Sequence, residues 1–194
     1  FSFYPTKVIT TGEGGMITTN NSMFSKKIQL LRSQGMSILP HQRESKNQWK
    51  YDITELGFNY RLDEIRSALG ISQLKRISLA NKKRIHIAKQ YDELLQNIEG
   101  IHIPKLKENR NHIYHLYSIR ITEDFHISRN KLFSKLSKHG IGTSVQYYPL
   151  HLMSFFKENY PQKNDDFHVS NLLKDQILCL PIFPTMNKKQ IEYV

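Results

Sequence analysis

The stretch FSFYPTKVITTGEGG, residues 1–15, places a lysine, Lys7, between an aromatic run and a turn that contains three glycines. Aromatic and β-branched residues on either side, over residues 1–4 and 16–20, are typical of short strands. Glycines at 12, 14 and 15 let the backbone turn tightly and approach a ligand closely. A surface lysine needs no such setting, so the stretch predicts a loop between two strands that presents the Lys7 amine.

Helical spacing of apolar residues follows this loop. A helix is expected over residues 22–34, and residues 36–56 look irregular. From Leu62 onward, Leu62, Ile65 and Leu69 recur at steps of three and four, which predicts a helix or helix pair over residues 61–98. A helix of this length often bridges two lobes, so we expect a first lobe over residues 1–98 that ends in this helix.

Strands alternate with helices in the rest of the chain. The pattern predicts strands at 115–121 and 140–148, helices at 128–139 and 171–177, an extended segment at 179–184 and a helix at the C-terminal end. This alternation is typical of a small α+β domain, which we expect over residues 99–194.

Composition narrows the class of protein. The chain has 194 residues, 39% of them hydrophobic, which is enough for a packed core. No apolar run has the length of a membrane-spanning helix, and no signal peptide is recognisable. Cys179 is the single cysteine, which excludes an intrachain disulfide, and we expect it to be buried. These features favour a cytoplasmic protein without a membrane partner.

The formal net charge of +11 favours partners that carry phosphate, such as nucleic acids or nucleotide-linked small molecules. The chain has no zinc-finger spacing and no aromatic-basic RNA-binding signature. The alternative hypothesis, a nucleic-acid-binding module, is therefore supported by charge alone, and we do not favour it. We expect the densest basic run to face solvent; it comprises Lys75, Arg76, Lys82, Lys83 and Arg84.

The first stretch resembles the Schiff-base segment of the nucleotide-sugar aminotransferases of the DegT/DnrJ/StrS type. A lone lysine in such a loop is more often a surface charge, so the resemblance is what assigns it a function. It implies that Lys7 binds pyridoxal 5'-phosphate covalently and moves the proton during transamination, with Ser2 near the cofactor. The matching residues are Phe1, Ser2, Phe3, Lys7, Thr10, Thr11, Glu13, Gly14 and Gly15.

A second block, ELGFNYRLDEIRSALGISQL at residues 55–74, is similar to the family's Gly-aromatic-Asn-aromatic-Arg segment. The resemblance implies that Asn59 reaches the cofactor phosphate of the partner subunit in a homodimer with shared active sites. Without the resemblance, Asn59 reads as a cap residue before the helix that starts near Leu62.

A third block, GIGTSVQYYPLH at residues 140–151, is similar to the strand that lines the family's sugar-nucleotide site. It implies substrate contacts from Gln146, Tyr147, Tyr148 and His151. Gln146 departs from the family pattern, which usually has histidine there; glutamine still forms hydrogen bonds but carries no charge. His151 alone also reads as an ordinary surface histidine.

The closing block, ILCLPIFPTMNKKQIEYV at residues 177–194, is similar to the family's final segment. The four blocks together imply part of a fold-type I transferase, of the α/β class, that uses pyridoxal phosphate and glutamate to aminate a nucleotide-linked keto-sugar. The resemblance also implies that residues 1–98 are the C-terminal part of the large cofactor-binding domain, including the long bridging helix, and that residues 99–194 are the small C-terminal domain.

Family members are about twice as long as this chain. We expect the piece alone to be inactive, because the aspartate that pairs with the pyridine nitrogen would lie in the other half. An inactive scaffold of the same family is a further alternative.

Overall fold

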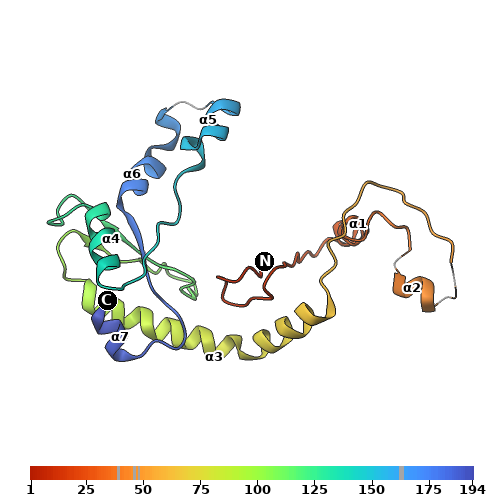
Figure 1. The fold of residues 1–194 in the computed structure, drawn as a ribbon, viewed down its shortest axis with the longest axis horizontal. Helices are drawn as coiled ribbons and strands as arrows, with labels where there is room; N and C mark the ends of the chain where they lie inside the picture. The colour runs from red at the N-terminus through yellow and green to blue at the C-terminus, as the bar shows by residue number, and fades with distance from the viewer. Residues whose placement is uncertain (39, 46, 48, 162–163) are drawn as a thin grey trace. The chain divides into compact units, whose positions relative to one another are not determined.

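The computed structural model describes residues 1–38, 40–45, 47, 49–161 and 164–194, and divides the chain into two units, Phe1–Ile77 and Ser78–Val194. The division falls inside the long helix α3 (Glu64–Leu95), which runs through both units (Figure 1). The predicted long helix over 61–98 is thereby confirmed, and Gly70 does not interrupt it. The predicted boundary between a large domain that ends at residue 98 and a small domain that begins at residue 99 applies to the intact protein, and it stays a prediction.

The first unit contains α1 (Ser22–Arg32), α2 (Pro40–Ser45) and the start of α3. Helix α1 confirms the prediction for residues 22–34. It begins where the Asn21 side chain accepts hydrogen bonds from the backbone N–H groups of Met23 and Phe24. Within the expected irregular region 36–56, α2 is a short helix, and positions 39, 46 and 48 lie outside the described residues.

The two strands predicted around Lys7 are wrong. Residues 1–4 and 16–20 form no strand, and only a single antiparallel bridge joins Ser2 to Gly15. A strand needs a neighbour for its backbone hydrogen bonds, and no further strand pairs with either segment among the residues that the structure describes. The strand preference of residues 1–4 and 16–20 is therefore not sufficient to form a strand without a pairing partner.

A close backbone crossing holds the first unit together after α1. Gly35 has a φ of +71°, and a Cβ atom there would lie 1.8 Å from the carbonyl oxygen of Glu55. The Gly35 carbonyl also accepts a hydrogen bond of 3.0 Å from the backbone N–H of Thr54. Lys27 of α1 forms an ion pair with Glu55 in the same region. Only glycine allows this approach of the two segments.

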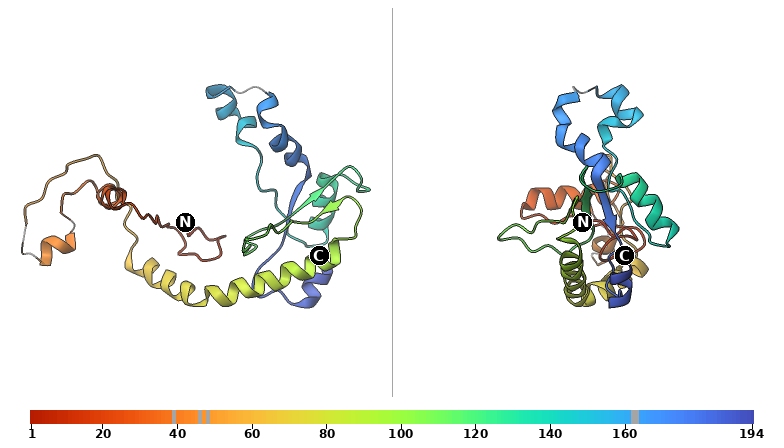
Figure 2. Two further views of the ribbon diagram at one scale, coloured as in Figure 1. Left: turned by 180° about the vertical axis from the view of Figure 1, so that it is seen from behind. Right: turned by 90° about the vertical axis from the view of Figure 1, so that its left-hand side faces the viewer.

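The second unit is built on a three-stranded antiparallel sheet in the order β1-β2-β3 (Figure 2). Its strands are β1 (Ile101–His102), β2 (Tyr117–Ile121) and β3 (Ile177–Leu180). Alternate β2 residues are buried, so one face of this strand points into the core. The strand predicted at 115–121 is confirmed, and part of the extended segment predicted at 179–184 belongs to β3.

The helices of the second unit are the second half of α3, α4 (Arg129–Lys138), α5 (Ser154–Asn159), α6 (His168–Gln176) and α7 (Lys188–Tyr193), with the 3₁₀ helices η1 (Leu150–Leu152) and η2 (Asn164–Phe167). Helices α4 and α6 contact this sheet, whereas α5 lies on an arm that projects away from it (Figure 1). The helices predicted at 128–139, at 171–177 and at the C-terminal end are confirmed, although α6 begins three residues earlier than predicted. The core unites α3, the sheet and α7; it comprises Ile87, Ala88, Tyr91, Tyr114, Tyr117, Ile119, Ile121, Leu178, Leu180 and Ile191.

The strand predicted at 140–148 is wrong. Only Ser144 pairs with the sheet, exchanging two backbone hydrogen bonds of 2.8 and 3.2 Å with Cys179 of β3. Pro149 follows and has no N–H group with which to extend the pairing. Cys179 itself is 3% exposed, as expected for a small apolar residue.

Arg84 corrects the prediction that the basic run of α3 faces solvent. Its side chain is buried, and its Nη1 atom donates hydrogen bonds to the carbonyl groups of Tyr114, His115 and Ile182. Burial lowers the pKa of the Arg84 guanidinium. Arg84 therefore ties α3 to two segments that flank the sheet instead of adding to a surface patch.

Among the described residues, no helix has both the length and the apolar character that crossing a bilayer requires.

Candidate active site

Lys7 lies on a loop that closes on itself. The backbone N–H of Phe3 donates to the carbonyl of Gly14 at 2.9 Å, and the N–H of Thr11 donates to the carbonyl of Phe3 at 3.0 Å. Phe3 is the buried residue at the base of this loop. The Lys7 N–H donates to the Tyr4 carbonyl at 3.0 Å, which adds a turn just before the side chain. The lysine is thus presented from a short, closed segment.

The surroundings of Lys7 fit a covalent role for its amine. The side chain is half-buried, and no hydrogen bond or ion pair of its ammonium is found within the described part of the chain. Gly14 has a φ of +142°, and a Cβ atom there would lie 2.9 Å from both Leu62 and the Thr11 hydroxyl. The turn is therefore packed tightly beneath the loop while the amine stays available.

The two threonines of the motif are used by the loop itself. The Thr10 hydroxyl donates to the carbonyl of Phe3 at 2.9 Å and accepts from the N–H of Gly12 at 3.0 Å. The Thr11 hydroxyl donates to the carbonyl of Glu13 at 2.7 Å. Both protons are committed, so these hydroxyls hold the loop closed and are poor donors to a ligand.

Ser2 differs from the two threonines because its hydroxyl does not donate a hydrogen bond within the loop. Its hydroxyl accepts a weak hydrogen bond of 3.4 Å from the N–H of Tyr4, and the residue is exposed. An accepting hydroxyl keeps its own proton for another acceptor. Ser2 therefore remains a suitable donor to an anionic group near the Lys7 loop.

Asn59 lies on an extended segment packed against the end of α1. The N–H groups of Phe58 and Tyr60 donate to the carbonyls of Leu31 and Arg32 at 2.7 and 2.9 Å, which satisfies carbonyls at the helix end. The rings of Phe58 and Tyr60 stack with centroids 4.9 Å apart. In an extended segment, the Asn59 side chain between them points to the opposite side.

Asn59 is exposed, and no contact with Lys7 or Ser2 is found among the described residues. Helix α3 begins five residues later, at Glu64, and Asp63 instead accepts a hydrogen bond from the Arg66 N–H there. The alternative that Asn59 caps this helix is therefore wrong.

In the second unit, Gln146 and Tyr147 line a cavity of about 600 Å³. This volume lies within the range of small-molecule sites. The other lining residues belong to η2, α6 and the start of β3. The Gln146 Nε2 atom is 3.5 Å from the Ser144 hydroxyl, while its Oε1 atom is buried without a hydrogen-bond partner in the described structure. Tyr148 is exposed and does not line the cavity.

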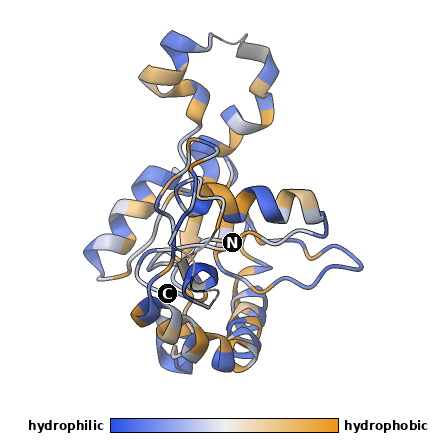
Figure 3. Ribbon diagram, turned by 90° about the vertical axis from the view of Figure 1, so that its right-hand side faces the viewer, coloured by the Kyte–Doolittle hydropathy of each residue, from blue (hydrophilic) through white to orange (hydrophobic). Residues whose placement is uncertain are grey.

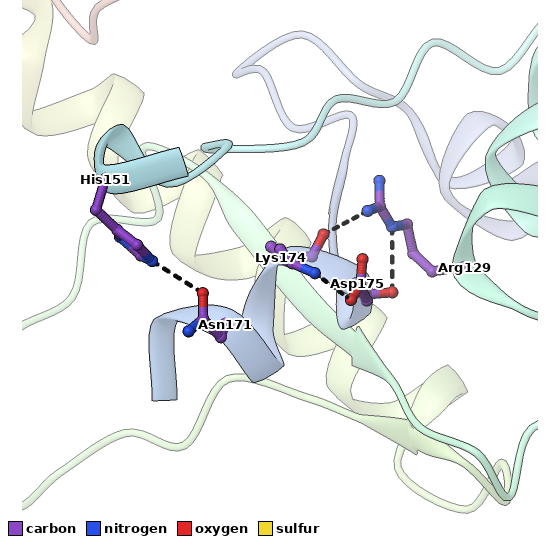
Figure 4. A network of polar contacts seen from close by, with 5 residues as sticks. All are labelled: Arg129, His151, Asn171, Lys174 and Asp175. Atoms are coloured by element: carbon purple, nitrogen blue, oxygen red, sulfur yellow. Dashed lines mark hydrogen bonds and ion pairs between the residues drawn. The ribbon is translucent and has the colours of Figure 1, made fainter. Parts of the chain in front are cut away.

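His151 contacts the wall of this cavity and does not line it. Its Nε2 atom is 2.9 Å from the Asn171 Oδ1 atom of α6 (Figure 4), and its ring stacks on Phe167 with centroids 4.3 Å apart. Because Phe167 lines the cavity, His151 supports the site from behind. The alternative of an ordinary surface histidine does not account for these two contacts.

Sequence reasoning did not identify the residues that η2 and α6 contribute to the cavity. They carry no recognisable motif, and only tertiary contact brings them to Gln146. The signal available in the sequence was a cluster of polar and charged residues just before an expected helix. The main polar members are Asp166, His168, Ser170 and Lys174.

Comparison with known proteins gives a consistent result. The DegT/DnrJ/EryC1/StrS aminotransferase family matches residues 1–194. The chain is 40% identical over 193 residues, 98% of its length, to the uncharacterized protein MJ1066 of Methanocaldococcus jannaschii, covering 50% of that protein. It is 36% identical over its full length to the UDP-4-amino-4,6-dideoxy-N-acetyl-beta-L-altrosamine transaminase of Campylobacter jejuni, covering 49% of that enzyme. The chain therefore spans about half the length of the curated relatives that it matches.

Solved structures agree with the sequence matches. PseC of Helicobacter pylori, an aminotransferase involved in the biosynthesis of pseudoaminic acid, superposes with a TM-score of 0.86 and 28% identity. That match covers 98% of this chain and 49% of PseC. The predicted fold class, part of a fold-type I transferase with α/β character, is confirmed. By sequence and by fold, the chain belongs to the DegT/DnrJ/EryC1/StrS aminotransferase family.

Proposed function

We propose that the intact protein is a pyridoxal-phosphate-dependent aminotransferase that converts a nucleotide-linked keto-sugar into an amino-sugar, with glutamate as the amino donor. The observation that carries this proposal is a lysine on a closed, glycine-packed loop, whose amine has no partner among the described residues, in a chain that matches a sugar aminotransferase family along its whole length.

The names of relatives support the substrate class. The Campylobacter jejuni relative is a UDP-sugar transaminase, and a Caulobacter vibrioides relative, 30% identical, is GDP-perosamine synthase. SpsC of Bacillus subtilis, 33% identical, is a spore coat polysaccharide biosynthesis protein. These names support a role for the intact protein in the synthesis of polysaccharide or glycan precursors.

The cofactor assignment rests on the same relatives and on the Lys7 loop. The sugar aminotransferase Spr1654 of Streptococcus pneumoniae, which is 25% identical to this chain, has been solved in PLP and PMP forms. When bound, pyridoxal phosphate supplies an aldehyde for amines and a ring that withdraws electrons from the reacting carbon.

Each proposed site residue has a distinct task. Lys7 would hold the cofactor through its amine, and the same amine, when released, would take and return the proton at the reacting carbon of the substrate. Ser2 donates its free hydroxyl proton to the cofactor. Gln146 and Tyr147 form the substrate side, where Gln146 contributes hydrogen bonds without charge. His151 supports this side from behind through Phe167 and Asn171, and Tyr148 lies outside the cavity.

Lys7 is tested by borohydride reduction of the intact-length protein loaded with pyridoxal phosphate, followed by peptide mapping. We expect the label on the peptide that contains Lys7, and no label in a Lys7→Ala variant. Lys27→Ala, which removes another lysine of the same unit, is the matched control and should label as the unaltered protein does. A label on any other lysine would refute the assignment.

We propose that the intact protein is a homodimer in which the Asn59 amide reaches the cofactor phosphate of the partner subunit. The exposure of Asn59 and the absence of a contact with Lys7 in the described chain support this arrangement. Intact-length subunits with Lys7→Ala are mixed with subunits carrying Asn59→Ala. About a quarter of the sites should then be whole after random exchange, by two-fold symmetry. Activity that stays at the level of the single variants, despite proven exchange, would exclude shared sites.

The protein is proposed to work in the cytoplasm, since its single cysteine and its nucleotide-linked substrate suit that compartment. Cell fractionation with an antibody against the chain checks this location, and recovery with secreted proteins would contradict it.

A further inference from the structure

Helix α3 contains one glycine, Gly70, for which the helix backbone gives no reason. Glycine is a poor helix former, because it loses more backbone entropy on folding than any other residue. The φ of Gly70 lies outside the left-handed region, so its conformation does not require glycine. A Cβ atom at this position would lie 3.1 Å from the Thr11 Cγ2 atom, which is closer than an ordinary contact between two carbon atoms. The glycine therefore makes room for a side chain of the loop that carries Lys7.

Thr11 is one of the two buried residues in segment 1–20, and Phe3 is the other. The backbone N–H of Thr11 donates to the Phe3 carbonyl at 3.0 Å, and its hydroxyl donates to the Glu13 carbonyl at 2.7 Å. The hydroxyl is thus committed to the turn, while the methyl group lies against α3 at Gly70. Lys7 lies in the sequence between these two buried residues, so their positions determine where its amine is held.

A second close contact holds the same turn. A Cβ atom at Gly14 would lie 2.9 Å from the Leu62 Cδ1 atom, just before α3 begins. The turn therefore meets the start of α3 at two points, each of which involves a glycine. In the described structure, no strand pairs with residues 1–20, so the two contacts with α3 supply the restraint that a sheet would otherwise give.

We propose that Thr11 is a positioning residue for Lys7, and that its methyl group holds the Lys7 amine in place by packing on Gly70. The inference rests on the proposed function, because that function gives the Lys7 amine its reaction. Thr11 acts through the loop and not on the reacting atoms, since its hydroxyl is already committed to Glu13. A displacement of a reacting group by about 1 Å slows a reaction about a hundredfold, so a shift of the turn should change the reactivity of Lys7.

The test measures how fast Lys7 of the intact-length protein, freed of cofactor, captures added pyridoxal phosphate. Borohydride stops the reaction at set times, and peptide mapping measures the label at Lys7. Gly70→Leu keeps a good helix former in α3 but leaves no room for the Thr11 methyl group, so capture should slow about tenfold or more. Ser72→Leu is the matched control, because it places the same side chain at an exposed position of α3, and it should change the rate less than about twofold.

A further pair of variants tests the contact between Thr11 and Gly70 directly. Gly70→Ala adds one methyl group and should slow capture about threefold, since the turn has to shift by less than 1 Å. Thr11→Ser removes the facing methyl group and keeps the hydroxyl, so the double variant should recover to within about twofold of the unaltered rate. If Thr11→Ser does not relieve Gly70→Ala, the added methyl group acts through another neighbour and the inference is overturned.

Two further measurements separate positioning from a role in the fold. Gly70→Ala should keep or raise the helix content measured by circular dichroism, because alanine favours a helix over glycine, while capture at Lys7 slows. Acetic anhydride modifies amines without a cofactor site. The ratio of acetylation at Lys7 to that at Lys26, an exposed lysine of α1, should shift in Gly70→Leu and stay unchanged in Ser72→Leu.

The outcomes distinguish this inference from the proposed function. Equal rates of capture in Gly70→Leu and Ser72→Leu, with the label at Lys7 of the unaltered protein, would refute the inference alone. No label at Lys7 of the unaltered protein would refute the aminotransferase, and the acetylation ratio would then decide whether Thr11 and Gly70 position Lys7. If Gly70→Leu loses its helical circular dichroism, Gly70→Ala and its double variant with Thr11→Ser decide.

Discussion

In the described part of residues 1–77, Phe3 is the one buried hydrophobic side chain, whereas residues 78–194 bury a continuous cluster that includes Tyr91, Tyr117 and Leu178. Hydrophobic residues occur in both units, as the colouring in Figure 3 shows. In the first unit they are largely exposed, with Leu56 at 89% and Ile65 at 85%. The two units therefore differ in burial and not in the presence of apolar residues.

This difference shows which physical terms maintain each unit. The second unit removes apolar surface from water, which is the largest favourable contribution to folding. The first unit relies on backbone hydrogen bonds around Phe3 and on the crossing at Gly35, each of which contributes only about 1 kcal/mol net. We therefore expect the second unit to be the stable part of the chain, and the following predictions test that contrast.

The largest effect is expected from Leu178→Ala. Leu178 is fully buried in β3, so its truncation should lower the free energy of unfolding of the second unit by about 2–5 kcal/mol. Leu74→Ala, at a leucine that is 58% exposed on the first-unit part of α3, should change it by less than about 0.5 kcal/mol. Urea unfolding followed by near-ultraviolet circular dichroism of the tyrosines measures both. Equal effects of the two variants would remove the contrast between the units.

The helices were predictable because their signal is local. The spacing of Leu62, Ile65 and Leu69 predicts α3, although Ile65 and Leu69 are exposed in the described chain. The strands predicted beside Lys7 and at 140–148 failed because a strand depends on a partner elsewhere in the chain. The strand at 115–121 succeeded since two neighbouring strands pair with it.

The next effect concerns alkaline pH. Burial raises the pKa of Tyr91, and burial together with the hydrogen bond to Asp92 raises that of Tyr117. The folded chain keeps these protons, while the unfolded chain loses them near pH 10. Stability should therefore be complete below about pH 10 and decline above it, by about 1.4 kcal/mol per pH unit for each of the two tyrosines.

Urea unfolding at pH 9, 10 and 11 measures this decline. Tyr91→Phe should reduce the slope but not abolish it, because burial also raises the pKa of Tyr117 and of Tyr114. This variant also loses the hydrogen bond to the Pro181 carbonyl. Tyr160→Phe, at an exposed tyrosine, should leave the slope unchanged. A slope that does not respond to Tyr91→Phe would show that other groups control alkaline unfolding.

The smallest effect compares two helix caps. Asn187 forms a capping box with Gln190 at the start of α7, and Asn21 caps α1. Asn187→Ala should destabilise the second unit by about 1 kcal/mol. Asn21→Ala should leave the unfolding of the second unit unchanged and should only accelerate amide hydrogen exchange in α1. A change of the main unfolding transition in Asn21→Ala would show that the units unfold together.

The candidate site was predictable in part. The glycines around Lys7 predict the closed loop that the structure shows, because they permit its tight turn, whereas the role of the Lys7 amine rests on the family resemblance and stays a prediction. The wall formed by Asp166 and Lys174 was not predictable, since ordinary polar residues gain their meaning only when α6 packs beside Gln146. The supporting role of His151 was hidden for the same reason, because Asn171 and Phe167 are its neighbours only in space.

The enclosure of Arg84 also bears on how this protein behaves in salt solutions. Its charge is surrounded by three carbonyl dipoles and is counted in the +11 of the sequence. A charge without access to mobile ions has no counter-ions to release and gains little from screening. Retention on a cation-exchange column will therefore reflect the lysines at the surface, and a charge count from the sequence alone overstates the attraction of this chain for polyanions.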